Sequence, residues 1–199
     1  MASTIKWLGK PRWGKDCEPA VRGNPLTLFA DTVSEREMLC DQLEAIADSL
    51  PNSLDRAVVL SATRFLRHKV PAYHRDERDC LFPMLERRAP QSFGMNGIAM
   101  MMQNCQVDDE DYALELADML ETLADQQRVG NPDATGYMLR GFFQSYRRYL
   151  AWQRLTILPL AAHLLSAEDL ANLLEAIYWT RSAGGPPKLY LVPDGTRMT

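Results

Sequence analysis

One stretch of the chain combines side chains that could bind a metal with an apolar stripe in helical spacing. It runs over residues 71–85 (PAYHRDERDCLFPML) and contains a histidine, several carboxylates and an apolar run. If His74 faces inward, helical spacing places Arg78, Leu81 and Leu85 on the same face. Imidazoles and carboxylates are metal ligands, whereas a guanidinium is a fixed cation. The stretch therefore predicts a metal site in which one ligand has been replaced.

The composition is that of an ordinary globular domain, with 199 residues, 46% of them hydrophobic, and a formal net charge of −4. No block of Lys and Arg indicates a nucleic-acid partner or an anionic membrane surface. Residues 1–24 lack the apolar run of a signal peptide, and no apolar stretch is long enough to cross a membrane. The four cysteines form no CxxC pair, which favours reduced thiols. We therefore expect a cytoplasmic protein.

Hydrophobic periodicity predicts four long amphipathic helices. Asn24 and Asn131 each precede a proline, and this pairing of an N-cap with a proline is typical of a helix start. The first helix is expected over about 25–50, the second after a cap at Ser53 to about 88, the third to about 127 and the fourth over about 132–164. Pro71 and Pro159 lie inside two of these patterns and should kink the helices without ending them.

A shorter fifth helix is expected to begin at Ser166, which resembles the start of a capping box, and to end near Arg181. No stretch alternates with period two for long enough to predict a sheet. The fold class is therefore all-α, an antiparallel four-helix bundle over residues 25–182. An irregular N-terminal arm (1–24) and an extended C-terminal tail (183–199) should flank it.

The run around His74 resembles the second helix of hemerythrin-like (HHE cation-binding) domains, which reads roughly P-x-x-H-x-x-x-E with acidic residues and L-F-P close behind. The residues L-P-L-A at 158–161 resemble the end of the fourth helix of that family. The resemblance covers about 25–178. It implies a four-helix bundle around a di-iron site, with one His on helix one, H-x-x-x-E on helix two, one His on helix three and H-x-x-x-E on helix four.

Most of the ligands that the resemblance implies are replaced in this chain. The matching positions are Thr32, His74, Arg78, Cys105, Tyr149 and Gln153, with Asn104 as an alternative to Cys105. Only His74 is a ligand of the expected type, and the chain has three histidines in all. The resemblance thus implies a hemerythrin-like fold without iron, and no cofactor is expected.

The inward register of Arg78 requires an acceptor, because a buried guanidinium keeps its charge. Glu35 and Asp108 are the expected partners, and an internal salt bridge would then join the helices. If neither carboxylate reaches Arg78, the cavity beside His74 would suit a small anion.

Three functions are compatible with these patterns. The first is a non-catalytic regulatory, sensory or protein-binding bundle whose protein partner or small ligand is unknown. The second is a metal or redox/oxygen sensor that binds iron through a reduced set such as His74, Glu77, Cys105 and Tyr149. The third is an oxidase or peroxidase, which rests on fold analogy alone. No phosphate-binding loop or nucleophile elbow is present, so we do not expect an enzyme.

Overall fold

A computed structural model describes residues 23–51, 54–90, 94–126 and 130–183 of the chain. Most of the expected N-terminal arm and C-terminal tail lies outside these described residues, and so does Ser53.

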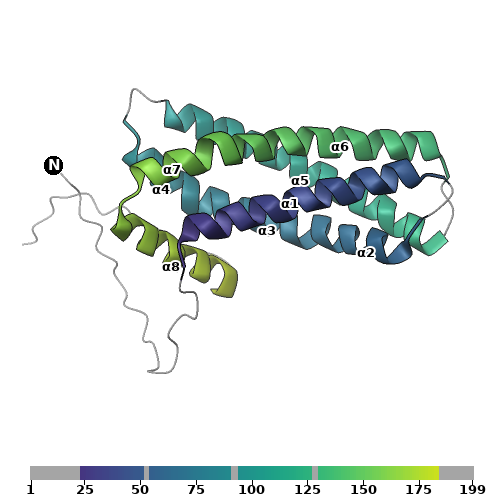
Figure 1. The fold of residues 1–199 in the computed structure, drawn as a ribbon, viewed down its shortest axis with the longest axis horizontal. Coiled ribbons are helices and arrows are strands. Elements are labelled where there is room, and N and C mark those ends of the chain that lie inside the picture. Colours follow the sequence, from purple (N-terminus) through teal and green to yellow (C-terminus); the bar gives the residue numbers. More distant parts are fainter. Residues whose placement is uncertain (1–22, 52–53, 91–93, 127–129, 184–199) are drawn as a thin grey trace, which may run out of the picture.

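Four antiparallel helical rods form the body of the molecule (Figure 1). The first rod is α1 (Pro25–Ser49), and the third is α5 (Met95–Gln126). The second rod is a continuous helix made of α2 (Arg56–Arg64), η1 (Phe65–Lys69), α3 (Val70–Asp76), η2 (Glu77–Leu81) and α4 (Phe82–Arg88). The fourth rod consists of α6 (Pro132–Trp152), η4 (Gln153–Ile157) and α7 (Leu158–Leu164), and α8 (Ala167–Ala183) follows it. The described residues contain no strand. The prediction of an all-α, antiparallel four-helix bundle with a short fifth helix is confirmed.

Two helices begin at the asparagines identified in the sequence. The Asn24 side chain accepts a hydrogen bond from the Leu26 N–H (3.0 Å), and the Asn131 side chain accepts one from the Ala134 N–H (3.1 Å). Each bond satisfies an N–H that has no partner within the helix, and the proline that follows has no N–H to satisfy. These N-cap predictions are confirmed.

The capping box before α8 is also present. The Ser166 N–H donates to Asp169 Oδ2 (3.0 Å), and the Asp169 N–H donates to the Ser166 hydroxyl oxygen (3.2 Å). The second rod begins differently from the expectation. Its first described helical residue is Arg56, and the cap is Asp55, whose carboxylate accepts from the Ala57 N–H at 2.8 Å.

Three π-helical segments interrupt the second and fourth rods, and each ends two residues before a proline. The prolines are Pro71, Pro83 and Pro159. A proline inside an α-helix removes one backbone hydrogen bond and clashes with the carbonyl four residues earlier. The wider π turn accommodates both effects, and the rods continue through the prolines as predicted. Each π segment also shifts the angular positions of the residues after it.

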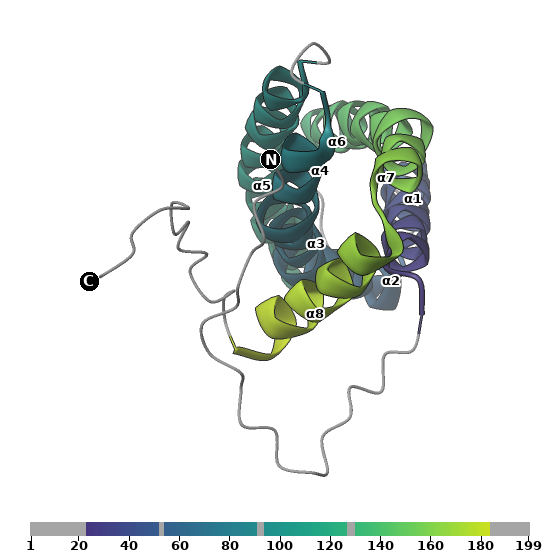
Figure 2. The ribbon, with the colours of Figure 1, turned by 90° about the vertical axis from the view of Figure 1, so that its left-hand side faces the viewer.

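Helix α8 lies across the bundle and contacts α1 and η2 (Figure 2). Arg181 Nη2 lies 2.7 Å from Asp76 Oδ2, and Cys80 Sγ lies 3.3 Å from the Thr180 hydroxyl. The second rod packs against the bundle core on one side and against α8 on another. More of its surface is therefore buried than in an amphipathic helix that packs on one side only.

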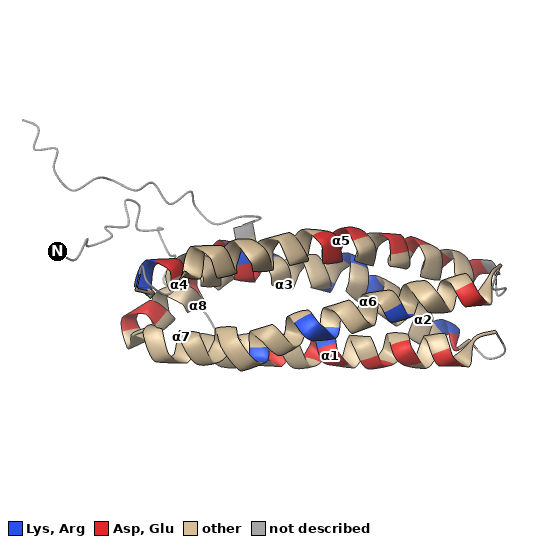
Figure 3. Ribbon diagram, turned by 90° about the horizontal axis from the view of Figure 1, so that it is seen from above, with Lys and Arg blue, Asp and Glu red and all other residues tan. Residues whose placement is uncertain are grey.

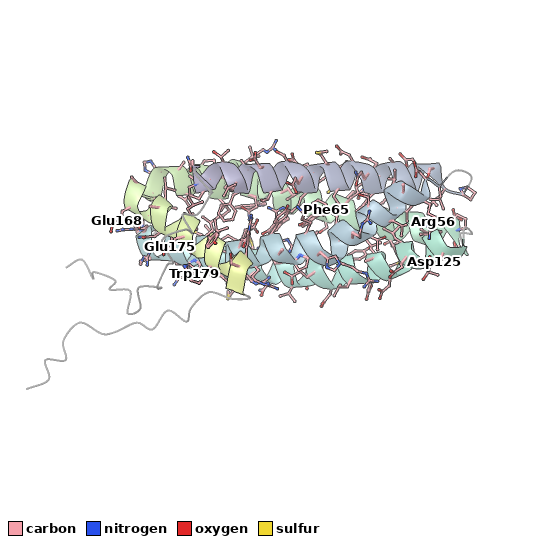
Figure 4. The ribbon with its side chains drawn as sticks, turned by 90° about the horizontal axis from the view of Figure 1, so that it is seen from below. Arg56, Phe65, Asp125, Glu168, Glu175 and Trp179 are labelled. Carbon is pink, nitrogen blue, oxygen red and sulfur yellow. The ribbon has the colours of Figure 1, made fainter. Side chains whose placement is uncertain are left out.

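The hydrophobic core extends along the bundle and draws on all four rods. Its largest fully buried apolar side chains are Leu39, Leu43, Leu66, Leu81, Phe82, Leu85, Met102, Leu116, Leu120 and Phe142. At the end away from α8, Arg56 lies beside Asp125 (Figure 4), and its Nε donates to the Ala124 carbonyl at 3.0 Å. No helix within the described ranges has the length and apolar character needed to span a bilayer.

Candidate functional site

A fully buried ion pair joins the first and second rods. Arg36 on α1 and Glu77 on η2 both have 0% relative exposure, and Arg36 Nη2 lies 2.7 Å from Glu77 Oε1. The guanidinium also donates from Nε to the Thr32 carbonyl (3.1 Å) and from Nη2 to the Thr32 hydroxyl (3.3 Å). Burial opposes the charge of Arg36, but the Glu77 carboxylate, together with the nearby Tyr146 and Tyr149 hydroxyls, raises its pKa. Arg36 therefore stays charged in the interior.

The other Glu77 oxygen connects the pair to the third and fourth rods. Glu77 Oε2 accepts from the Tyr149 hydroxyl and from Gln106 Nε2, the latter at 2.7 Å. The Tyr149 hydroxyl in turn accepts from Gln106 Nε2 (2.7 Å) and from Gln153 Nε2 (3.0 Å). All of these side chains are buried. We call the five residues Arg36, Glu77, Gln106, Tyr149 and Gln153 the central network, which links all four rods.

The π turns place two members of the central network. Glu77 is the first residue of η2 and Gln153 the first of η4. Their carbonyls accept from the N–H groups of Phe82 and Leu158, five residues later. π turns inside α-helices are frequent at functional sites. Here Pro83 and Pro159, which follow the two π turns, explain why the turns form at these places.

A second chain of polar contacts runs from the bundle interior to its edge. His74 has 0% exposure, and burial holds its pKa below the ordinary value, so the ring is neutral. Its Nδ1 lies 3.1 Å from Glu110 Oε1 and its Nε2 3.1 Å from the Tyr146 hydroxyl. Since an ionised carboxylate can only accept, Nδ1 carries the proton and Nε2 accepts from Tyr146. Both ring nitrogens are occupied.

Glu110 is the outermost residue of the contacts that begin at Tyr146 and pass through His74. Burial would raise the pKa of Glu110, but hydrogen bonds from His74 and Arg78 hold it below its usual value. Arg78 Nη1 lies 2.6 Å from Glu110 Oε1, and the two side chains are 28% and 24% exposed. The Tyr146 and Tyr149 rings stack with centroids 5.9 Å apart, and so the two polar chains are in contact through aromatic rings.

Asp109 is a further buried carboxyl, one helical turn beyond Gln106 on α5. Burial, with a smaller contribution from neighbouring Asp108, raises the pKa of Asp109 to about 7. Its protonation therefore changes near neutral pH.

Arg78 is not the inward charge that the sequence predicted. It lies at the edge between the second and third rods, and its partner is Glu110 rather than Glu35 or Asp108. Glu35 is exposed and accepts from the Tyr73 hydroxyl at 2.5 Å. Asp108 is also exposed. His74, Leu81 and Leu85 of the predicted stripe are buried, but the Arg78 side chain is 28% exposed and reaches Glu110 at the margin of that face. The expectation was wrong because a long guanidinium side chain can keep its charged end at the surface.

On the third rod, Cys105 and Asn104 are both exposed, and the buried residue is Gln106. The placement of Cys105 on the inner stripe is therefore wrong by one residue, a rotation of about 100°. His74, Tyr149 and Gln153 lie inside the bundle, and Thr32 is buried against Arg36. The structure thus brings together four of the six matched positions and excludes Arg78 and Cys105.

Sequence reasoning missed Arg36 and Gln106 because both are polar. A signal was nevertheless present, since Val33, Arg36, Leu39 and Leu43 follow a three-four spacing in the sequence. A charged residue that completes an apolar stripe is a candidate for a buried site.

The donor set does not fit the di-iron centre that the resemblance implies. Such centres need several imidazoles and carboxylates facing two cations. Here the permanent charge of Arg36 lies against the one carboxylate of the central network, whose other members are a phenol and two amides. Within the described ranges, no three His, Cys, Asp or Glu side chains are grouped so that they could hold a metal ion.

Comparison with known proteins identifies a family for this chain. No curated protein matches the chain. The hemerythrin HHE cation-binding domain matches residues 36–161, from Arg36 on the first rod to Ala161 on the fourth. That range contains every residue of the central network and parts of all four rods. This chain therefore belongs to the hemerythrin HHE cation-binding domain family.

Proposed function

We propose that this protein is a non-catalytic member of its family in which an internal ion pair has replaced the di-iron site, and that it has a regulatory, sensory or protein-binding role in the cytoplasm. The observation that supports this proposal is the Arg36–Glu77 pair, fully buried at 2.7 Å. A guanidinium cannot lose its proton in a protein, so Arg36 repels any cation that Glu77 could bind.

The fourth rod supports the same proposal. By the resemblance, Tyr149 and Gln153 stand where the family pattern has the His and Glu of H-x-x-x-E, and both are buried. The Tyr149 hydroxyl donates to Glu77, and Gln153 Nε2 donates to the Tyr149 hydroxyl. The large ring of Tyr149 fills space by packing, without a metal.

A partner-binding role is supported by the outward face of α5. Residues 95–126 contain eight Asp and Glu, six of them exposed, and no Lys or Arg, and red segments of the ribbon recur along α5 in Figure 3. Met100, Val107 and Leu114 are each at least 46% exposed and recur every seven residues, on one side of this helix. Apolar side chains in such a stripe suit a helix laid along them, and the surrounding carboxylates favour a basic one. The proposed partner is therefore a protein that presents an amphipathic basic helix.

Iron analysis of the purified full-length chain tests the loss of the di-iron site. Protein produced in iron-supplemented cells should contain well under one iron per chain and show no oxo-bridge absorption band in the visible spectrum. Stoichiometric iron with that band would overturn the proposal and favour the sensor with a reduced ligand set. In that case the Glu77→Gln and His74→Ala variants would lose the metal.

The α5 face is tested by comparing the proteins captured by three baits: the wild type, a Val107→Ser/Leu114→Ser variant, and the matched control Tyr137→Ser. Tyr137 is 79% exposed but lies on α6. A partner that the double variant loses and the control keeps supports the proposed face. Identical capture by all three baits contradicts it.

A further inference from the structure

Three buried polar atoms in the central network have no hydrogen-bond partner. They are Arg36 Nη1, Gln106 Oε1 and Gln153 Oε1, and no other buried side-chain nitrogen or oxygen of the described residues shares this property. The three residues are 0%, 0% and 1% exposed. An unsatisfied polar atom is costly in a protein interior. Arg36 and Gln106 both contact Glu77, and Gln106 and Gln153 both contact the Tyr149 hydroxyl, so the three atoms belong to side chains gathered around the same two groups.

The orientations of the two amides follow from the network. Gln106 must direct Nε2 toward Glu77, because a carboxylate can only accept. Gln153 must direct Nε2 toward the Tyr149 hydroxyl, because that hydroxyl already donates its proton to Glu77. Neither amide can be reversed without placing an oxygen against an oxygen that has no proton to give. Both Oε1 atoms therefore remain acceptors, and Arg36 Nη1 remains a donor.

The charges around these atoms select a neutral partner. Arg36 and Glu77 cancel each other, and the two amide oxygens would repel an anion. The guanidinium of Arg36 would repel a cation. A partner shared by all three atoms would therefore be a neutral molecule that accepts one hydrogen bond and donates two.

We propose that the interior of the bundle contains a binding site for one small neutral molecule, which accepts a hydrogen bond from Arg36 Nη1 and donates to Gln106 Oε1 and Gln153 Oε1. Water has this chemistry, and so does a small neutral compound with two hydroxyl or amide N–H donors. The molecule links the first, third and fourth rods where the family implies metals. This inference rests on the proposed function, because a di-iron centre would occupy the same space.

A high-resolution crystal structure of the full chain tests the site, with crystals grown from two unrelated precipitants. The expected result is density between the three atoms in both crystal forms. Mass spectrometry of the solution released by denaturation then identifies the source: an organic compound that fits the density, or none if the molecule is water. Density that changes with the precipitant shows an adventitious additive only and overturns the proposal. Side chains that rotate to pair with one another, without density, also overturn it.

A pair of variants tests the role of the amide in solution. Gln153→Met keeps the length of the side chain and removes its acceptor, and Gln103→Met makes the same change on α5 outside the network. Nuclear Overhauser contacts from water or from the released compound to the Gln106 side-chain amide should be present in the wild type and in Gln103→Met. They should be lost in Gln153→Met. Contacts that persist in Gln153→Met, or that the wild type lacks, contradict the site even if that variant folds poorly.

The two proposals fail in different ways. Stoichiometric iron in the purified protein overturns the proposed function and this site together. An iron-free protein whose three atoms pair with one another overturns only this site.

Discussion

Replacement of Arg36 by methionine should be among the most destabilising single changes in this protein. Methionine provides an unbranched, apolar side chain of similar length. The substitution removes the charge, two hydrogen bonds to Thr32 and the ion pair with Glu77. Removal of one partner of a buried pair typically costs about 3–5 kcal/mol, because the other charge stays buried without compensation. Glu77 keeps donors from Tyr149 and Gln106, so we expect the lower half of that range, about 3–4 kcal/mol.

Urea unfolding at pH 7, followed by far-UV circular dichroism, measures this loss. The double variant Arg36→Met/Glu77→Gln completes a cycle, and it should be more stable than the sum of the single losses predicts, by about 1–3 kcal/mol. Arg140→Met is the matched control, since Arg140 also joins α1 to the fourth rod through Asp48 at 2.9 Å, but both side chains are exposed. That control should change stability by no more than about 1 kcal/mol. A loss below about 1 kcal/mol for Arg36→Met, or an additive cycle, would refute the reasoning.

Other substitutions test the remaining contacts. Tyr149→Ala should lower the free energy of unfolding by about 3–5 kcal/mol, as large-to-small core changes do. Tyr149→Phe should lower it by about 1–3 kcal/mol, because Glu77, Gln106 and Gln153 lose the hydroxyl that they share. Equal unfolding midpoints for the wild type and the Phe variant would contradict these hydrogen bonds. Asp109 has a folded pKa of about 7 against an ordinary 3.8, so its contribution to stability is present at low pH and is lost as the pH rises through 7. The wild type should therefore lose up to about 4 kcal/mol of its free energy of unfolding between about pH 4 and 7, and Asp109→Asn should remove this decline. An unchanged pH profile in the variant would show that the carboxyl is not desolvated. Arg78→Gln should cost only about 1 kcal/mol in the same urea assay, because its pair with Glu110 is partly exposed; a loss near that of Arg36→Met would restore Arg78 as the buried charge.

Local patterns in the sequence were sufficient to predict the rods. The cap-plus-proline starts at Asn24 and Asn131 and the capping box at Ser166 involve residues within a few positions of one another, so no distant contact is needed to specify them. The inward positions of Tyr149 and Gln153 followed from the apolar stripe of the fourth rod, where large side chains dominate. Whether these residues occupy former ligand positions stays a prediction, because the structure shows where they lie and not what they replaced.

The tertiary structure alone decided which polar residues are buried. Glu35 and Arg36 are adjacent and both charged, so polarity does not decide which of them is buried. At Cys105 and Gln106 an amphipathic pattern assigns the more polar Gln106 to the solvent. The burial of Arg36 depends on Glu77, 41 residues away, and the orientation of Gln106 depends on Tyr149, 43 residues away. The covering of the second rod by α8 is equally remote in the sequence. A helix-periodicity argument sees only neighbours along one helix, whereas the free energy of burying a charge is determined by its partner on another.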